Sequence, residues 1–181
     1  YTNEGQIKSA MLKGQTLVNL DSNGSTIGTL GTSLWSKENS YHIANKPTDK
    51  TCGRNFTKKG GDFTQGEKIL IVIDNQGDHL NLYGRQNYYG IGITFQQGLT
   101  KRVFTIPDNC VPGLVIGRLD NVEANIKFRV MFLEYQEGME NWDIPYFEDM
   151  QSVTVSTRLE NKLGTCTVGS IAQYAKNGKT L

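Results

Sequence analysis

The stretch that decides the fold reads Ala124-Asn125-Ile126-Lys127-Phe128-Arg129-Val130-Met131-Phe132-Leu133-Glu134. Every second residue from Ile126 to Phe132 is a large apolar one. Alternate side chains of an extended chain point to opposite faces, so these residues share one face and Lys127 and Arg129 share the other, with Met131 and Leu133. A helix would scatter the two charges around its axis. The pattern therefore predicts a β-strand with one face in a core.

Shorter runs of the same kind predict further strands, at residues 69–73, 80–83, 91–95, 103–106 and 114–119. The run 69–73 is continuous and β-branched, which is typical of a strand covered on both faces. Turn-forming residues at 74–78 predict a hairpin between two of these strands. Strands at this spacing, without a sustained helical stripe, predict an all-β fold: an antiparallel two-sheet β-sandwich of the jelly-roll type.

The composition predicts three regions. Residues 11–153 carry the strand pattern and are assigned to the sandwich, after a lead-in at 1–10. Within them, residues 21–66 are rich in Gly, Ser, Thr, Asn and Lys, which predicts long loops with one or two short strands near 34–35 and 41–43. Apolar density falls after residue 153, so 154–181 is interpreted as a connector or the start of another element. The first residue is Tyr1 rather than Met, which suggests a fragment of a longer polypeptide.

Charge and cysteine content argue against several classes of protein. The chain has 19 Lys and Arg against 18 Asp and Glu, so no basic excess indicates a nucleic-acid partner. The longest apolar stretch, 69–73, is far too short to span a membrane. The three cysteines are widely spaced and fit neither a disulfide framework nor a zinc motif, so reduced thiols of a protein folded in a cytosol are expected.

Two segments resemble a known family. The first segment is Met11-Leu12-Lys13-Gly14-Gln15-Thr16-Leu17-Val18-Asn19-Leu20, and the second is Ile144-Pro145-Tyr146-Phe147-Glu148-Asp149-Met150-Gln151-Ser152-Val153. They resemble the opening strand and the exit of a jelly-roll module found in minor structural, tail and baseplate proteins of phages and prophages of Gram-positive bacteria. In that module Gly is usual at the place of Asp149. Residues 106–133 resemble the closing strands of galactose-binding-like and carbohydrate-binding modules.

The resemblance implies a location as well as a fold. It implies a virion protein of the tail or baseplate that is assembled in the bacterial cytoplasm. Its expected partners are other tail proteins, and several copies of the chain together could form a homo-oligomer in the parent assembly. It carries no catalytic set and no assigned ligand. No membrane or nucleic-acid partner is expected.

Catalytic and metal motifs are not found. His42 and His79 stand in no motif with a cysteine and are interpreted as surface-loop residues. Nothing pairs the carboxylates that a glycosidase would need, whether Asp74, Asp78, Glu134 or Glu148. The turn at 21–25 offers oxygen ligands for a structural Ca²⁺ but lacks the spacing of an EF-hand loop, so a plain turn is favoured. We therefore expect a protein that is not an enzyme and has no cofactor.

The candidate ligand-binding residues are aromatic and planar polar side chains, which suit the apolar faces and hydroxyl rims of sugars. Alternation with Leu80 and Leu82 puts Asn81, Tyr83 and Arg85 on the face away from the core. If the strands share a sheet, Lys127 and Arg129 join them there. The loop beyond the strand adds Tyr88 and Tyr89, and Trp35 is a further candidate, while Trp142 is interpreted as packing.

Two functions therefore remain open. The first is a non-catalytic tail or baseplate module that binds surface carbohydrate of the host bacterium, with avidity from many copies. The second is a structural spacer or assembly module without a glycan ligand, because jelly rolls serve both roles. A groove lined by Tyr83, Arg85 and Arg129 would favour the first, and a large apolar patch the second.

Overall fold

The computed structural model describes residues 13–21, 24–28, 35–148, 150–155, 159–161 and 164–166. The chain divides into two compact units, one of residues 17–151 and one of residues 1–16 and 152–181. Strand β1 (Lys13–Val18) pairs with β12 (Met150–Val155), and both have residues in each unit. Strands β13 (Leu159–Asn161) and β14 (Gly164–Cys166) pair within the second unit. The division of the chain at 153/154 stays a prediction, and Asp149 lies outside the described residues.

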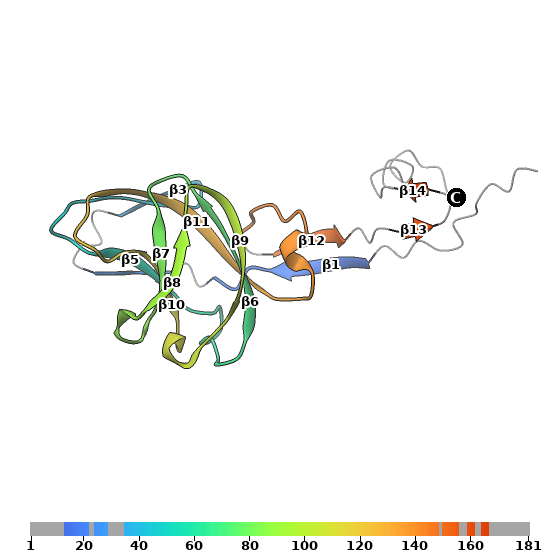
Figure 1. Cartoon of the computed structure of the whole chain (residues 1–181), viewed down its shortest axis with the longest axis horizontal. Coiled ribbons are helices and arrows are strands. Elements are labelled where there is room, and N and C mark those ends of the chain that lie inside the picture. Colours follow the sequence, from blue (N-terminus) through green and yellow to red (C-terminus); the bar gives the residue numbers. More distant parts are fainter. Residues whose placement is uncertain are drawn as a thin grey trace, which may run out of the picture. The chain divides into compact units, whose positions relative to one another are not determined.

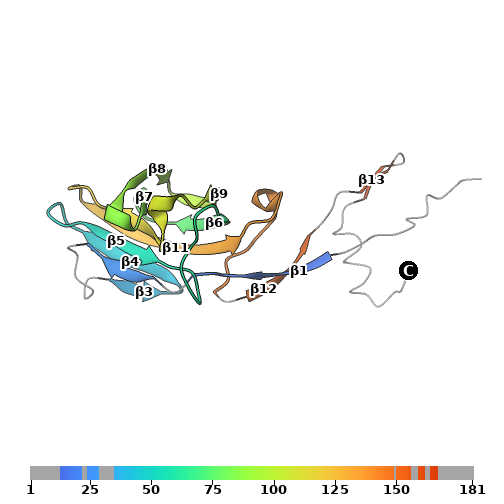
Figure 2. The same ribbon diagram turned by 90° about the horizontal axis from the view of Figure 1, so that it is seen from below.

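The first unit is a jelly-roll sandwich of two five-stranded antiparallel sheets (Figure 1). Sheet I has the order β2 (Ser25–Ile27), β5 (Cys52–Phe56), β10 (Leu114–Arg118), β7 (Leu80–Gly84), β8 (Gly90–Phe95). Sheet II has the order β3 (Ser36–Glu38), β4 (Tyr41–Lys46), β11 (Ala124–Glu134), β6 (Lys68–Asn75), β9 (Gly98–Thr105). Figure 2 shows β3, β4 and β5 toward one edge and β8 and β9 toward the other.

Helical structure among the described residues is limited to three 3-10 turns: η2 (Gln86–Tyr88), η3 (Asp108–Cys110) and η4 (Met139–Asn141). No helix of the described part of the chain is long and apolar enough to cross a membrane. The sequence prediction of an antiparallel two-sheet β-sandwich is therefore confirmed.

The main core lies between the sheets and is built from alternate residues of each strand. Phe128 is fully buried, and the neighbouring Lys127 and Arg129 on the outer face are only half-buried, as alternation predicts. Opposing positions from sheet I, such as Phe56 and Leu82, complete the core. The fully or nearly fully buried members are Ala44, Cys52, Phe56, Phe63, Ile69, Ile71, Ile73, Leu80, Leu82, Phe95, Phe104, Ile106, Cys110, Leu114, Ile116, Ala124, Ile126, Phe128, Val130 and Phe132.

A second apolar layer covers part of the outer face of sheet II. Four residues of β6 and β11 that alternate with the core residues, and therefore face outward, are also buried: Leu70, Val72, Met131 and Leu133. The segment 135–148 supplies their cover with the buried side chains of Met139, Ile144 and Phe147. The backbone N–H of Phe147 donates to Met131 Sδ at 3.2 Å, and Asn19 donates to the carbonyl of Phe147 at 3.3 Å. The continuous apolar pattern of 69–73 is thus explained by cover on both faces.

Two sequence expectations are wrong. Residues 21–66 contain more strands than the one or two expected, because β2, β3, β4 and β5 all lie within them. The turn at 74–78 does not close a hairpin, because β6 belongs to sheet II and β7 to sheet I. A turn signature shows that the chain reverses, but it does not show which sheet the next strand joins.

His42 is a core residue rather than a surface-loop one. It lies on β4 with 4% of its surface exposed, and its ring packs 5.8 Å from Phe56 and 5.4 Å from Phe128, centroid to centroid. Burial, assisted by the charges of Arg54 and Lys37, lowers the pKa of His42 from 6.5 to about 3. The imidazole is therefore neutral in the folded protein over a pH range where the unfolded chain would protonate it.

We expect this buried imidazole to make stability depend on pH. Because the folded pKa lies below 6.5, its contribution is complete above that pH and declines as pH falls toward about 3. His42→Phe removes the titration and keeps an aromatic ring. Between pH 6.5 and roughly 4.5, the wild type should lose about 2–3 kcal/mol more than the variant. Urea unfolding at several pH values measures the difference. His79→Gln, at an exposed histidine, is the control, and equal pH profiles for wild type and His42→Phe would contradict the prediction.

Candidate functional site

The outer face of sheet II is occupied by the protein's own side chains. The Arg129 guanidinium lies between two rings, 4.7 Å from the Tyr41 centroid and 4.4 Å from that of Tyr146. It also pairs with Asp74, with nitrogen–oxygen distances of 3.0 and 3.1 Å. Both faces of the guanidinium are thus covered and its carboxylate partner is in place.

The rest of this network is also internally paired. Tyr41 donates to the Asp74 carboxylate and accepts from Gln76 Nε2 at 2.6 Å. Burial, with the hydrogen bond to Asp74, raises the pKa of Tyr41. Lys127 Nζ lies 5.3 Å from the Tyr41 centroid. Arg129 therefore helps to fasten the segment 135–148 to sheet II, and this face offers a ligand little unpaired polar surface.

The outer face of sheet I is different, because a row of polar groups crosses it. Asn81 and Thr94 are direct partners on β7 and β8, and Thr94 Oγ1 donates to Asn81 Oδ1 at 2.8 Å. Asn81 Nδ2 donates to the Tyr83 hydroxyl at 3.4 Å. Each of the three groups can still form a hydrogen bond with a ligand. The amide has a second N–H, the phenol can donate its own hydrogen, and the threonine hydroxyl can still accept one.

Glycines leave open space beside Tyr83. Gly90 is the direct partner of Tyr83 across the β7–β8 pair. A Cβ built at Gly90 or at Gly92 would meet no atom within 4 Å. Gly90 has an ordinary strand conformation, whereas Gly92 has a φ of +75° that favours glycine. Apart from residues adjacent in the chain, no atom therefore lies close to the side-chain positions of these two glycines, of which Gly90 is paired with Tyr83.

The loop 84–90 presents two exposed tyrosines at the end of this face. Tyr88 is 49% exposed and Tyr89 is 60% exposed. Asn87 and Tyr88 both have left-handed backbones, with φ of 54° and 52°, which is costly for residues other than glycine. Three backbone hydrogen bonds hold the loop: Gly84 N–H to Tyr89 O at 2.8 Å, Tyr89 N–H to Gln86 O at 3.3 Å and Arg85 N–H to Gly113 O at 3.0 Å. Strain held in this way is typical of functional loops.

The structure does not bring all the predicted site residues together. Asn81 and Tyr83 lie on sheet I, whereas Lys127 and Arg129 lie on β11 of sheet II, so the expectation of one shared face is wrong. Alternation fixed the facing of each strand correctly but could not show that β7 and β11 belong to different sheets. Thr94, Gly90 and Gly92 were not singled out, although the alternation of 91–95 indicates their outward facing.

Trp35 is half-buried and packs against the core rather than standing free. The Arg54 guanidinium lies 5.6 Å from its ring centroid, and Arg54 also donates to the carbonyl of Gly24 at 2.7 Å. The indole therefore closes the side of the sandwich near β5, and we leave Trp35 out of the candidate face.

Several of the groups considered for catalysis are buried or have structural partners in the described part of the chain. Burial raises the pKa of the Cys52 thiol to about 12 and that of Cys110 to about 11, so neither is an activated nucleophile. Asp74 pairs with Arg129, Asp78 accepts from the Asn125 N–H at 2.7 Å, and Glu148 pairs with Lys37 at 4.0 Å.

No cluster of three or more His, Cys, Asp or Glu that could hold a metal occurs among the described residues. Ser22 and Asn23 of the suggested calcium turn lie outside the described residues.

Comparisons with known proteins add a likeness of fold. No protein-family model matches the chain, and no curated protein matches it. Among solved structures, one described as carbohydrate binding module family 29 has a TM-score of 0.47 and 10% identity, covering 73% of this chain and 99% of that one. A family 29 module from Piromyces equi has a TM-score of 0.42 and 12% identity, covering 68% and 87%. A mutant of a related module, complexed with mannohexaose, has a TM-score of 0.44 and 11% identity, covering 67% and 92%. These likenesses concern the fold alone, and the assignment of a jelly-roll β-sandwich rests on the strand order of the two sheets.

Proposed function

We propose that the chain is a non-catalytic module that binds carbohydrate on the outer face of sheet I. One observation carries the proposal: Tyr83 lies beside unfilled space over Gly90 and Gly92, in line with the polar groups of Asn81 and Thr94. An aromatic ring supplies a platform for the C–H face of a sugar, and the amide and hydroxyls supply forked donors and acceptors for its rim.

The neighbouring loop strengthens this proposal. Tyr88 and Tyr89 are exposed, yet their backbone is fixed by hydrogen bonds at both ends of the loop. Because the backbone that carries the rings is held in place before a ligand arrives, binding would cost little ordering of the loop backbone. Open polar surface alone is common on antiparallel sheets, but exposed aromatics on a strained and fixed loop are not.

The biological setting is also a proposal, and it rests on sequence. Residues 11–20 and 144–153 resemble the entrance and exit of a module of phage tail and baseplate proteins. We propose that the chain belongs to a virion tail or baseplate, where it contacts surface glycans of the host bacterium and other tail proteins. Many copies would give avidity to a weak single site.

Tyr83→Ala is expected to weaken binding to purified Gram-positive cell walls about thirtyfold, which corresponds to roughly 2 kcal/mol for a lost stacking aromatic. Tyr83 is half-buried on an outer face, so the melting temperature should fall only slightly. Co-sedimentation with the walls measures binding, and calorimetry measures stability.

Two further variants sharpen the test. Gly90→Val fills the space beside Tyr83 at a position with an ordinary strand φ and no neighbour within 4 Å, so it should preserve folding and reduce binding. Lys127→Ala on the other sheet should leave binding unchanged. If wall binding survives both Tyr83→Ala and Gly90→Val, the site lies elsewhere. If the wild type does not bind walls or any glycan of an array, the structural-spacer role replaces this proposal.

A further inference from the structure

We propose that the carbohydrate recognised by this face carries an acidic group, a carboxylate or a phosphate, which Arg85 binds. This inference rests on the function proposed above and specifies the chemical class of its ligand. The geometry that carries it is the position of Arg85 at the base of the tyrosine loop, together with the charge distribution of sheet I.

Arg85 is an exposed arginine whose backbone is held by hydrogen bonds. It directly follows Gly84, whose N–H donates to the carbonyl of Tyr89, so Arg85 is the first residue of the loop that this bond closes. The N–H of Arg85 itself bonds to Gly113 O at 3.0 Å. Arg85 therefore stands two residues beyond Tyr83, where strand β7 ends and the loop that carries Tyr89 begins.

The side chain of Arg85 contrasts with three other arginines. Arg54 stacks on Trp35, Arg118 pairs with Asp120, and Arg129 pairs with Asp74 between two tyrosines. Among the described residues, Arg85 forms no ion pair and no ring contact. A guanidinium presents a planar fork of donors that matches the two oxygens of a carboxylate or phosphate.

The charge distribution of sheet I favours an anion over a cation. Residues 80–95 contain a single charged side chain, that of Arg85. None of the five strands of sheet I contains an Asp or Glu, whereas sheet II has acidic residues on β3, β6 and β11. An acidic residue on a neighbouring turn is the exposed Asp108 of η3, which packs near β7. It forms no ion pair with Arg85 among the described residues. An acidic sugar would thus approach the face without meeting a like charge from its strands.

Matched polymers test the proposal directly. Polygalacturonate and its carboxyl-reduced form differ only in the acidic group, and Gram-positive cell walls before and after hydrofluoric acid differ in their phosphodiester-linked polymers. We expect the acidic member of at least one pair to bind about tenfold more tightly at low salt, and the preference to shrink as salt rises. The pair that shows the preference identifies carboxylate or phosphate as the recognised group.

Arginine variants assign the effect to one residue. Arg85→Ala should abolish the preference for the acidic polymer, and Arg85→Lys should keep a part of it, because a lysine retains the charge without the planar fork. Arg102→Ala is the matched control: Arg102 is exposed on β9 of sheet II, and it also forms no ion pair with the described residues.

The outcomes separate this inference from the function on which it rests. Equal binding of the acidic and neutral members of both pairs, or an equal loss with Arg102→Ala, overturns the acidic-ligand proposal. If neutral polymers bind in a way that needs Tyr83 but not Arg85, carbohydrate binding stands and the acidic ligand is rejected. If no polymer binds, both proposals fail together.

Discussion

Phe128→Ala is expected to destabilise the sandwich by about 3–5 kcal/mol, the cost of removing a large aromatic from a packed core. The Phe128 side chain is fully buried at the middle of β11 and contacts rings from two other strands, with centroids 5.4 Å away at His42 and 6.3 Å away at Phe56. Its removal leaves a cavity that the surrounding strands cannot close, because their backbones are fixed by ladders on both sides. Urea unfolding followed by tryptophan fluorescence measures the change.

The adjacent residue provides the control for this prediction. Lys127 is half-buried on the opposite face, where its ammonium lies over the Tyr41 ring. Lys127→Ala should cost at most about 1 kcal/mol. Equal losses for the two variants would mean that the facing of β11 is incorrect.

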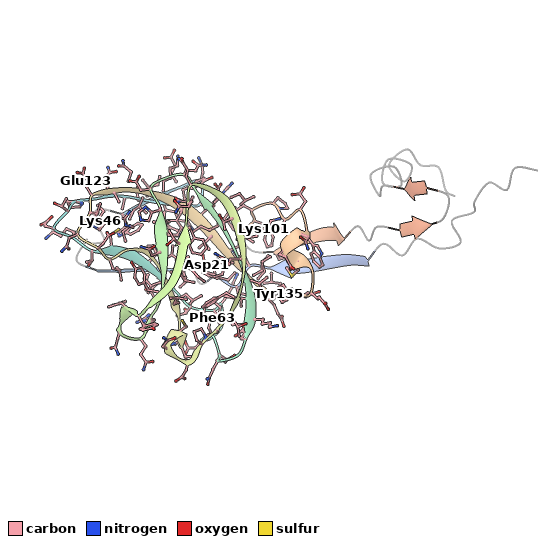
Figure 3. All side chains as sticks on the ribbon, viewed as in Figure 1. Asp21, Lys46, Phe63, Lys101, Glu123 and Tyr135 are labelled. Carbon is pink, nitrogen blue, oxygen red and sulfur yellow. The ribbon has the colours of Figure 1, made fainter. Side chains whose placement is uncertain are left out.

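Asp120→Asn is the second large effect, with an expected loss of about 2–4 kcal/mol. The carboxylate lies between two buried cations: Arg118 NH2 is 2.5 Å away, and Lys46 Nζ is 3.8 Å from the other oxygen. Lys46 is completely buried, at the end of the sandwich where Glu123 is also labelled in Figure 3, and its ammonium donates to the carbonyls of Val122 and Pro47. The neutral amide would leave both cations without a counter-charge. The range allows for the 38% exposure of the Asp120 side chain.

A double-mutant cycle separates this electrostatic effect from simple side-chain loss. In a Lys46→Met background one of the two cations is gone, so Asp120→Asn should cost less there than in the wild type. Asp49→Asn makes the same chemical change at a surface carboxylate whose pair with Lys50 is exposed, and it should cost less than about 0.5 kcal/mol. The explanation would be wrong if the two Asp→Asn changes cost the same.

Strand facing was predictable from the sequence because alternation is a local property. The pattern around Phe128 fixed which side chains of β11 face the core, and the alternation at Leu80 and Leu82 did the same for β7. The continuous apolar run 69–73 correctly indicated that β6 is covered on both faces. The segment that covers its outer face, 135–148, lies far along the chain and could not be identified from the run itself.

Strand β5 escaped prediction, and β4 was predicted only at 41–43, because their inward positions are not filled by large apolar residues alone. β4 puts His42, Ala44 and Lys46 toward the core, and β5 has the sequence Cys52-Gly53-Arg54-Asn55-Phe56. A polar residue can face inward where a partner is present, as the carbonyls of Val122 and Pro47 are for Lys46. Those partners come from other segments, so the local pattern cannot reveal them.

The candidate site was predictable in part for the same reason. The shared facing of Asn81 and Tyr83 follows from one strand and was correct, whereas the inclusion of Arg129 needed a pairing between strands and was not. The engagement of Arg129 with Tyr41 and Tyr146 depends on three separate segments of chain. The open space at Gly90 is visible only once β8 is placed beside β7.

The irregular pairing of β7 with β8 also affects how easily the edge of sheet I could pair with a strand of another copy. β8 is an edge strand of sheet I, and unpaired strand edges are templates for aggregation between copies. The ladder shifts register between Leu82 and Tyr83, and Gly92 departs from strand geometry with its φ of +75°. A regular strand from another molecule cannot continue such an edge. The other sheet ends in β9, where Lys101 and Arg102 bring charge to the edge. The glycine-rich irregularity beside Tyr83 is thus also expected to disfavour pairing of this edge with a strand of another copy.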